Sequence, residues 1–153
     1  MLSLYYYNPV YPVPDHRQKK PENPVTAAID LDNTTFRCVS RTADGKEVLD
    51  PGIKYQFQCN GSLVAAIYSG GGLEDGCILG QYYPEDGSFS GKWDHRAPGH
   101  DLRLMGDCET TPEVLPDGRV RLTRKWTYPK TEGGGDNEGI DILESVGKVN
   151  MRQ

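Results

Sequence analysis

Turn signals recur along the chain from Ile29 onward, at intervals of roughly a dozen residues. Each is a cluster of Gly, Pro, Asn or Asp that supplies the positive or fixed φ needed to reverse a strand. Between the clusters, no window of ten or more residues places apolar side chains at the three-and-four spacing of an amphipathic helix. We therefore predict an all-β chain. The seven turn signals are Ala43-Asp44-Gly45, Asn60-Gly61, Gly70-Gly71-Gly72, Glu85-Asp86-Gly87, Ala97-Pro98-Gly99, Pro116-Asp117-Gly118 and Gly133-Gly134-Gly135.

Seven reversals predict eight strands, each joined by a short link to the next strand in the sequence. An open antiparallel sheet would leave two edges exposed to aggregation, and closure into a barrel removes both edges. The fold class that we predict is therefore a closed eight-stranded antiparallel up-and-down barrel. The strands are expected near residues 34–41, 53–59, 63–69, 75–82, 88–95, 101–114, 119–128 and 139–146.

The barrel domain is predicted to span residues 29–147, after an extended N-terminal arm of residues 1–28 and before a C-terminal tail of residues 148–153. The arm carries four tyrosines and five of the 11 prolines of the chain, and proline excludes both a helix interior and a central strand. A free tail usually lacks aromatic residues. We therefore expect the arm to pack on the barrel, on a partner subunit or over the mouth of a pocket.

Charge and hydropathy exclude several classes of partner. Lys and Arg number 17 against 22 Asp and Glu, so the net charge is −5, and no basic stripe offers a surface for nucleic acid or an anionic membrane. No window approaches 18 consecutive apolar residues, and the first seven residues lack the basic start and cleavage site of a signal peptide. We expect a cytoplasmic protein with neither nucleic-acid nor membrane partners.

The four cysteines contain no Cys-x-x-Cys or Cys/His pair of the kind that holds zinc. We therefore predict no metal site. The cysteines are either small buried apolar residues or disulfide partners, and the second alternative needs an oxidising compartment. They are Cys38, Cys59, Cys77 and Cys108.

Alternation along the predicted strands separates an inward face from an outward face. The contrast is clearest over residues 119–128, where Val120, Leu122 and Trp126 alternate with polar side chains, whereas residues 75–82 favour neither face. The predicted inward set is Phe36, Cys38, Ser40, Tyr55, Phe57, Cys59, Val64, Ala66, Tyr68, Phe89, Gly91, Trp93, His95, Leu102, Leu104, Cys108, Val120, Leu122, Arg124, Trp126, Tyr128, Ile140, Ile142, Glu144 and Val146.

A barrel of this strand number encloses either its own side chains or one small ligand. Small residues such as Ala66 and Gly91 alternate with large aromatic residues on the inward face, which predicts a cavity for an apolar, planar or polycyclic molecule between Trp93 and Trp126. The side chains that we expect to contact this ligand are Tyr55, Phe57, Phe89, Trp93, Trp126, Tyr128 and Glu144.

Inward polar groups must be paired, hydrated or bound by a ligand, because burial without a partner costs free energy. Arg124 and Glu144 lie on neighbouring predicted strands, so a cross-strand ion pair is one way to satisfy both. If the protein is an enzyme, His95 is the first candidate for acid–base catalysis, with Tyr68 and Arg124 available to stabilise a carbonyl or enolate oxygen. Such a set suits a cofactor-independent isomerase or cyclase.

A family resemblance is carried by residues 35–42, 61–71, 76–80 and 108–119 and by the strand end Trp93-Asp94-His95. Its most specific part is the run Thr-Pro-Glu-Val-Leu-Pro-Asp-Gly at residues 111–118. Together these segments resemble a family of small microbial proteins, the avidin/lipocalin-like barrels that are often labelled N-acetylglutamate synthase. The resemblance covers residues 30–146 and implies a calycin-type barrel, in agreement with the turn pattern.

Acetyl transfer, the activity in that label, does not fit the residues. Coenzyme A needs a backbone nest or a helix N-terminus to hold its pyrophosphate. Gly70-Gly71-Gly72 and Gly133-Gly134-Gly135 are predicted hairpin loops between strands, so neither cluster opens a helix. We predict no acetyltransferase activity and no cofactor.

Two functions from different classes stay open. The first is a barrel that binds a small apolar or aromatic molecule, and that acts as a cyclase or isomerase in small-molecule biosynthesis if it turns the molecule over. The second is a structural or interaction protein whose barrel is filled by side chains and whose outer face forms an oligomer such as a homodimer. A cavity of roughly 300 Å³ or more supports the first, and a packed interior supports the second.

Overall fold

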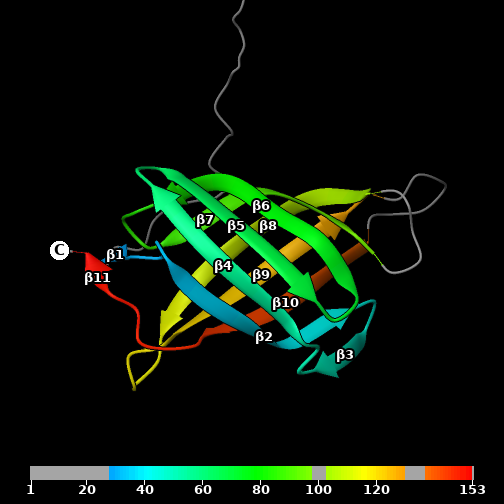
Figure 1. Cartoon of the computed structure of the whole chain (residues 1–153), viewed down its shortest axis with the longest axis horizontal. Helices are drawn as coiled ribbons and strands as arrows, with labels where there is room; N and C mark the ends of the chain where they lie inside the picture. Colours follow the sequence, from blue (N-terminus) through cyan, green and yellow to red (C-terminus); the bar gives the residue numbers. More distant parts are fainter. Residues whose placement is uncertain (1–27, 98–102, 130–136, 153) are drawn as a thin grey trace, which may run out of the picture.

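Eleven β-strands form the part of the chain described by the computed structural model, which covers residues 28–97, 103–129 and 137–152 (Figure 1). Within these ranges no helix has the length and apolar character needed to span a membrane. The predicted arm before Ala28, the turns around Pro98 and Gly134, and Leu102 lie outside the described residues. The strands are β1 (Ala28–Ile29), β2 (Thr34–Ala43), β3 (Lys46–Leu49), β4 (Ile53–Asn60), β5 (Leu63–Gly70), β6 (Leu73–Tyr83), β7 (Ser88–Arg96), β8 (Arg103–Val114), β9 (Val120–Tyr128), β10 (Asn137–Ser145) and β11 (Met151–Arg152).

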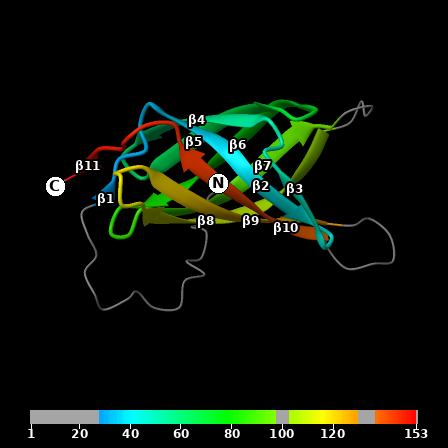
Figure 2. The same ribbon diagram turned by 90° about the horizontal axis from the view of Figure 1, so that it is seen from below.

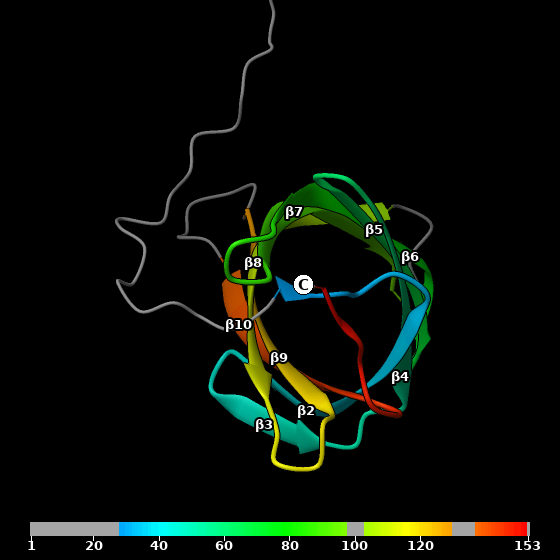
Figure 3. The same ribbon diagram turned by 90° about the vertical axis from the view of Figure 1, so that its left-hand side faces the viewer.

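Eight of these strands close into a barrel. β2 and β4 to β10 pair in sequence order, and β10 also pairs antiparallel with β2, for example through Ile140 with Thr42. Figure 3 shows the resulting ring end on. The predicted closed eight-stranded antiparallel barrel is confirmed.

β3 is a strand that the sequence analysis does not predict. Asp44 and Gly45, with φ angles of 53° and 78°, form the tight turn that joins β2 to β3. Within the described residues, β3 pairs with the second half of β2 alone. It therefore lies outside the ring, as Figure 3 shows.

One end of the barrel is closed by segments from both ends of the described chain. β1 pairs antiparallel with β11, and Figure 3 shows this pair across the opening of the ring, whereas Figure 2 shows the β2–β3 hairpin toward the opposite end. Ile29, Leu31 and Val149 are buried there, and the Tyr82 hydroxyl donates a hydrogen bond to the Ile29 carbonyl. We call this closure the cap. Val149 and Met151, from the predicted tail, therefore contribute to the folded core.

The interior has an apolar half beside the cap and a polar half beyond it. Phe36, Phe57 and Phe89 are at most 1% exposed, and their rings meet edge to face with centroids 5.3 and 5.7 Å apart. Full burial of each such side chain stabilises the fold by about 1.5–3 kcal/mol relative to exposure.

On β4, β5, β7 and β9, the residues that the alternating sequence pattern predicts to point inward are all buried or half-buried.

The predicted inward face of β10 is wrong. Its buried residues are Asp141, Leu143 and Ser145. The prediction took the apolar residues of this strand as its inner face, but the polar partners of Asp141 lie inside the barrel and draw that side chain inward. The residues that lie instead on the outer face are Ile140, Ile142, Glu144 and Val146.

A β-bulge in β2 explains a second correction. The register of β10 against β2 skips Val39, which is an extra residue on β2. A bulge reverses the alternation beyond it, so Arg41 points into the barrel and Ser40, predicted inward, points out. The Ser40 hydroxyl donates a hydrogen bond to the exposed Glu47 carboxylate at 2.8 Å.

Candidate functional site

A buried polar cluster occupies the half of the barrel away from the cap, with Asp141 at its centre. The Asp141 carboxylate is 0% exposed and accepts hydrogen bonds from Arg124 Nη1 at 3.0 Å and Trp126 Nε1 at 3.2 Å. The Tyr55 hydroxyl donates to the same carboxylate at 3.4 Å, and Arg41 Nη1 lies 3.6 Å from it. Four side chains from three strands thus offset the cost of burying one charge.

Strand register brings the three charged groups together. Asp141 on β10 stands directly opposite Arg124 on β9 and opposite Arg41 on β2. Directly opposed residues of antiparallel strands have Cβ atoms about 4.5–5.5 Å apart. The backbone pairing therefore places both guanidinium groups within reach of the carboxylate.

Tyr68 and His95 form a pair beside this cluster. The Tyr68 hydroxyl lies 2.7 Å from His95 Nδ1, and the imidazole stacks on the Trp93 ring at a centroid distance of 4.9 Å. Burial, reinforced by the charges of Arg41 and Arg124, lowers the pKa of His95 from 6.5 to about 4. Burial raises the pKa of Tyr68. At neutral pH a protonated phenol and a neutral imidazole therefore share this hydrogen bond.

Three aromatic rings of the cluster lie against glycines that are their direct cross-strand partners. The absent side chains give the rings room against the neighbouring strand, and such aromatic–glycine pairs help to fix the register of a sheet. The pairs are Tyr68 with Gly76, Trp93 with Gly106 and Trp126 with Gly139, where a Cβ atom on the glycine would lie 2.3, 2.8 and 2.2 Å from the ring.

Side chains fill this part of the interior. The Trp93 and Trp126 rings meet edge to face with centroids 6.1 Å apart, so the cavity predicted between them is absent. Phe57 and Phe89, which are predicted ligand contacts, belong to the apolar core beside the cap. The remaining space is too small for a water molecule and is enclosed by Arg41, Tyr68, Trp93, His95, Arg124 and Trp126.

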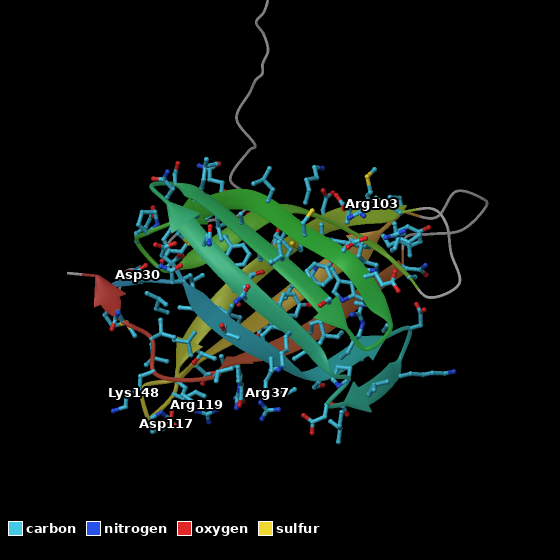
Figure 4. The ribbon with its side chains drawn as sticks, in the orientation of Figure 1. Asp30, Arg37, Arg103, Asp117, Arg119 and Lys148 are labelled. Atoms are coloured by element: carbon cyan, nitrogen blue, oxygen red, sulfur yellow. The ribbon has the colours of Figure 1, made fainter. Side chains whose placement is uncertain are left out.

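The predicted ion pair between Arg124 and Glu144 is also wrong. Arg124 binds Asp141, whereas Glu144 lies on the outer face and accepts hydrogen bonds from Arg121 Nη2 at 2.8 Å and Arg119 Nη1 at 3.3 Å. These bonds lower the pKa of Glu144. Figure 4 shows Arg119 projecting from the outside of the barrel. Glu144 therefore does not reach an interior ligand.

The cluster reaches solvent at the barrel end opposite the cap. The Arg41 side chain is 21% exposed, against 3% for Arg124, and its guanidinium carbon lies 5.3 Å from the centroid of the Trp126 ring. Tyr128 is half-buried, with its ring centroid 6.2 Å from that of Trp93. We call Arg41, Trp93, Trp126 and Tyr128 the aromatic end.

Asp141 and Arg41 are the two members of the site that the sequence analysis missed. Asp141 stands between two isoleucines, and the apolar pattern favoured those neighbours as the inner face. The sequence held one signal for Asp141. An acidic residue inside an apolar strand, next to the strand that carries Arg124, indicates that the acid is buried as the partner of that arginine. No sequence signal located the bulge that turns Arg41 inward.

Two ligand-sized hollows lie on the outer wall. One has a volume of about 560 Å³ and lies over β8, β9, β10 and the end of β2, and the other, of about 820 Å³, crosses β5 to β9. Both are lined by Asp107, Glu109 and Thr127, and Lys92 in the second pairs with Asp107 at 2.5 Å. Apolar side chains line them as well, Trp126 and Ile140 in the first and Leu63 and Leu79 in the second.

The described residues contain no candidate metal centre. Among them, no three or more His, Cys, Asp or Glu side chains lie close enough together to hold an ion. All four cysteines are free. Cys38 and Cys108 are buried, as the small-apolar alternative predicts. Burial raises the pKa of Cys38 to about 12, so this thiol is not a nucleophile at neutral pH.

The closed eight-stranded antiparallel barrel, with one capped end and one aromatic end, defines an up-and-down β-barrel of the calycin type. The sequence model of the avidin-like protein family matches residues 29–146, and the chain belongs to this family. The match extends from β1 to the end of β10 and so covers the whole barrel. No curated protein and no solved structure matches the chain significantly.

Proposed function

We propose that this protein binds a small planar molecule at the aromatic end of its barrel. The observation that carries the proposal is the position of the partly exposed Arg41 guanidinium beside the Trp126 ring, opposite the cap. The half-buried Tyr128 adds aromatic surface there, and the buried Trp93 ring packs against both aromatic side chains. Aromatic walls with a few convergent polar groups are typical of small-molecule sites, and the avidin-like barrel suits such binding.

The proposed ligand lies over the aromatic end, because the space among the interior side chains does not hold even a water molecule. Contact between aromatic rings contributes about 0.5–1.5 kcal/mol per pair beyond the burial of surface. The ligand class thus stays the one expected from the sequence, a planar or polycyclic molecule with a polar group. The proposed binding position, however, is the aromatic end and not the interior that the sequence predicts.

Both tryptophans of the chain belong to the aromatic end, so tryptophan fluorescence reports binding there. Native mass spectrometry of the protein mixed with a small-molecule extract from its source identifies a ligand by its retained mass. We expect Tyr128→Leu to weaken the binding of that ligand about tenfold in a fluorescence titration, through the lost ring contact. The control Val114→Ala, at the far end of β8 and 46% exposed, leaves affinity unchanged. No retained mass and no fluorescence change would contradict the proposal.

Isomerisation or cyclisation of the bound molecule stays a prediction for the Tyr68–His95 pair. In this proposal the His95 imidazole exchanges a proton with the ligand while the Tyr68 hydroxyl is hydrogen-bonded to its Nδ1. Arg124 is committed to Asp141, so Arg41 replaces it as the group that stabilises a ligand oxyanion. With the retained ligand as substrate, His95→Gln and His95→Ala should lose roughly 100- to 10,000-fold in rate. Rates within about twofold of the parent would remove His95 from the mechanism.

A second function is supported by exposed apolar side chains on the outside of β5 and β6. Leu63, Ile67 and Leu79 are 58–62% exposed on this face, and the neighbouring β4 side chains there are Gln56 and Gln58. A group of exposed apolar side chains is typical of protein interfaces. The filled interior agrees with this alternative, in which copies of the chain associate through the face.

Sedimentation velocity tests this second function. We expect the wild-type protein to dimerise with increasing concentration and Ile67→Glu to abolish the dimer, because a buried, unpaired charge is costly. Val48→Glu on β3, 53% exposed and away from the face, is the matched control and leaves the dimer intact. A wild-type protein that stays monomeric throughout would contradict association.

A further inference from the structure

We infer that the molecule bound at the aromatic end is an organic anion, such as an aromatic carboxylate, and that Arg41 binds its acidic group. The inference rests on the proposed function and adds the chemical class of the ligand and the residue that selects it. Three observations support it: the charge balance of the cluster, the bonding of Arg41 and the position of Arg41 beside an indole ring.

The cluster carries one more positive charge than negative charge. Arg41 and Arg124 share a single carboxylate, that of Asp141. His95, which faces both arginines, is neutral above pH 4 because burial lowers its pKa to about that value, and Tyr55 and Tyr68 are protonated because burial raises their pKa. A partly desolvated cation that must share its counter-ion is unfavourable, and an anionic ligand compensates it.

Arg41 is the arginine of the pair whose N–H groups a ligand can reach, because its side chain is 21% exposed against 3% for Arg124. Asp141 already accepts bonds from Arg124, Trp126 and Tyr55, and the 3.6 Å from its oxygen to Arg41 exceeds a good hydrogen bond. No other carboxylate of the described residues lies within 4.0 Å of Arg41. Asp94, the acid that follows Trp93, is bound by Arg103 at 2.8 Å. The Arg41 guanidinium thus keeps donors that a ligand carboxylate accepts in pairs.

The position of Arg41 also defines the shape of the anion. Its guanidinium carbon lies 5.3 Å from the centroid of the Trp126 ring, so a ligand whose carboxylate meets Arg41 brings its own ring to Trp126 and Tyr128. The bulge at Val39 turns Arg41 to this side of β2. Bulges commonly re-aim side chains at functional sites. An acidic group attached directly to a planar ring matches this arrangement.

The test compares two probes of nearly equal shape, naphthalene-2-carboxylate and its neutral amide, by isothermal titration calorimetry. We expect the wild-type protein to bind the carboxylate about tenfold or more tightly than the amide, because hydrogen bonds to a charged group are the stronger ones. Arg41→Gln should remove this preference and leave the affinity for the amide within about twofold. Arg41→Lys keeps the charge but not the paired donors, and should retain part of the preference.

Arg37→Gln is the matched control, because Arg37 is on the same strand but is bound to Asp50 at 3.0 Å on the outside of the barrel (Figure 4). It should leave both affinities unchanged. A thermal unfolding transition shows that each variant is folded. If Arg41→Gln does not fold, Arg41→Lys, which keeps the positive charge, serves as the test variant. Equal binding of the two probes, or a preference that survives Arg41→Gln in folded protein, overturns the inference while the proposed function stands. Binding of neither probe contradicts the proposed function itself, and the inference with it.

Discussion

Asp141 compensates the charge of Arg124, a side chain that is only 3% exposed. Asp141→Asn keeps the shape of the side chain but leaves that arginine buried without a counter-ion. We expect this variant to lower the free energy of unfolding by about 3–5 kcal/mol, measured by urea denaturation. Asp50→Asn is the control, because the Arg37–Asp50 pair is exposed and contributes little. Equally small losses in both variants would show that the buried cluster does not stabilise the fold.

His95 makes the stability of the barrel depend on pH. Its pKa is about 4 in the folded protein and 6.5 in the unfolded chain, so between these values the unfolded state binds a proton that the folded state rejects. The free energy of unfolding therefore falls as the pH decreases from 6.5 to 4.

His95→Gln removes this contribution and should flatten the pH dependence in that window. Urea titrations of both proteins at several pH values check this. Carboxylates contribute to both curves alike, so the difference between the curves isolates His95. Two parallel curves would mean that His95 is not shielded from solvent.

The strands of the polar half are held in register by their aromatic–glycine pairs. A Cβ atom at Gly139 would lie 2.2 Å from the Trp126 ring and 2.5 Å from the Thr42 carbonyl oxygen. Because one obstacle is backbone, β10 must shift, and we expect Gly139→Ala to lower the free energy of unfolding by about 1–3 kcal/mol. The near-ultraviolet circular dichroism of tryptophan should change as well. Gly147→Ala, with no atom within 4 Å, is the control, and a Gly139→Ala variant as stable as this control would place Trp126 away from β10.

For the complete barrel, the open question is the arm that precedes the cap. Residues 1–24 lie outside the described residues, so their docking stays a prediction from four tyrosines that have apolar area to bury and five prolines that limit the entropy lost. Deleting them leaves β1 in place and should lower the Tm in differential scanning calorimetry. An effect on the affinity for naphthalene-2-carboxylate would place the arm at the aromatic end. If Tm and affinity both stay at the full-length values, the segment is a tail without a docking site.

Local chemistry was enough to predict the architecture. Asp44-Gly45 and Gly118, all with positive φ, are turns that the sequence marks directly. Over Val120 to Tyr128, strict alternation identifies the inner face, which the burial of β9 confirms. Turns and alternation are local patterns, each defined by a few neighbouring residues. Eight short antiparallel strands in sequence order then avoid free sheet edges by closing into a barrel. The fold class, the positions of the eight barrel strands and most of the inner face followed from them.

The chemistry of the site depended on contacts between distant segments. Tyr55 and Asp141 are 86 residues apart along the chain, yet their side chains bond inside the barrel. Arg41 reaches the same carboxylate because one extra residue in β2 reverses its direction, and no local pattern marks that bulge. Packing between side chains of different strands likewise decides whether the barrel encloses a cavity. Here the Trp93 and Trp126 rings are in contact and fill the space between them. Alternation assigns a side chain to a face, but register and packing choose its partners, and those partners set both the buried charge and the space left for a ligand.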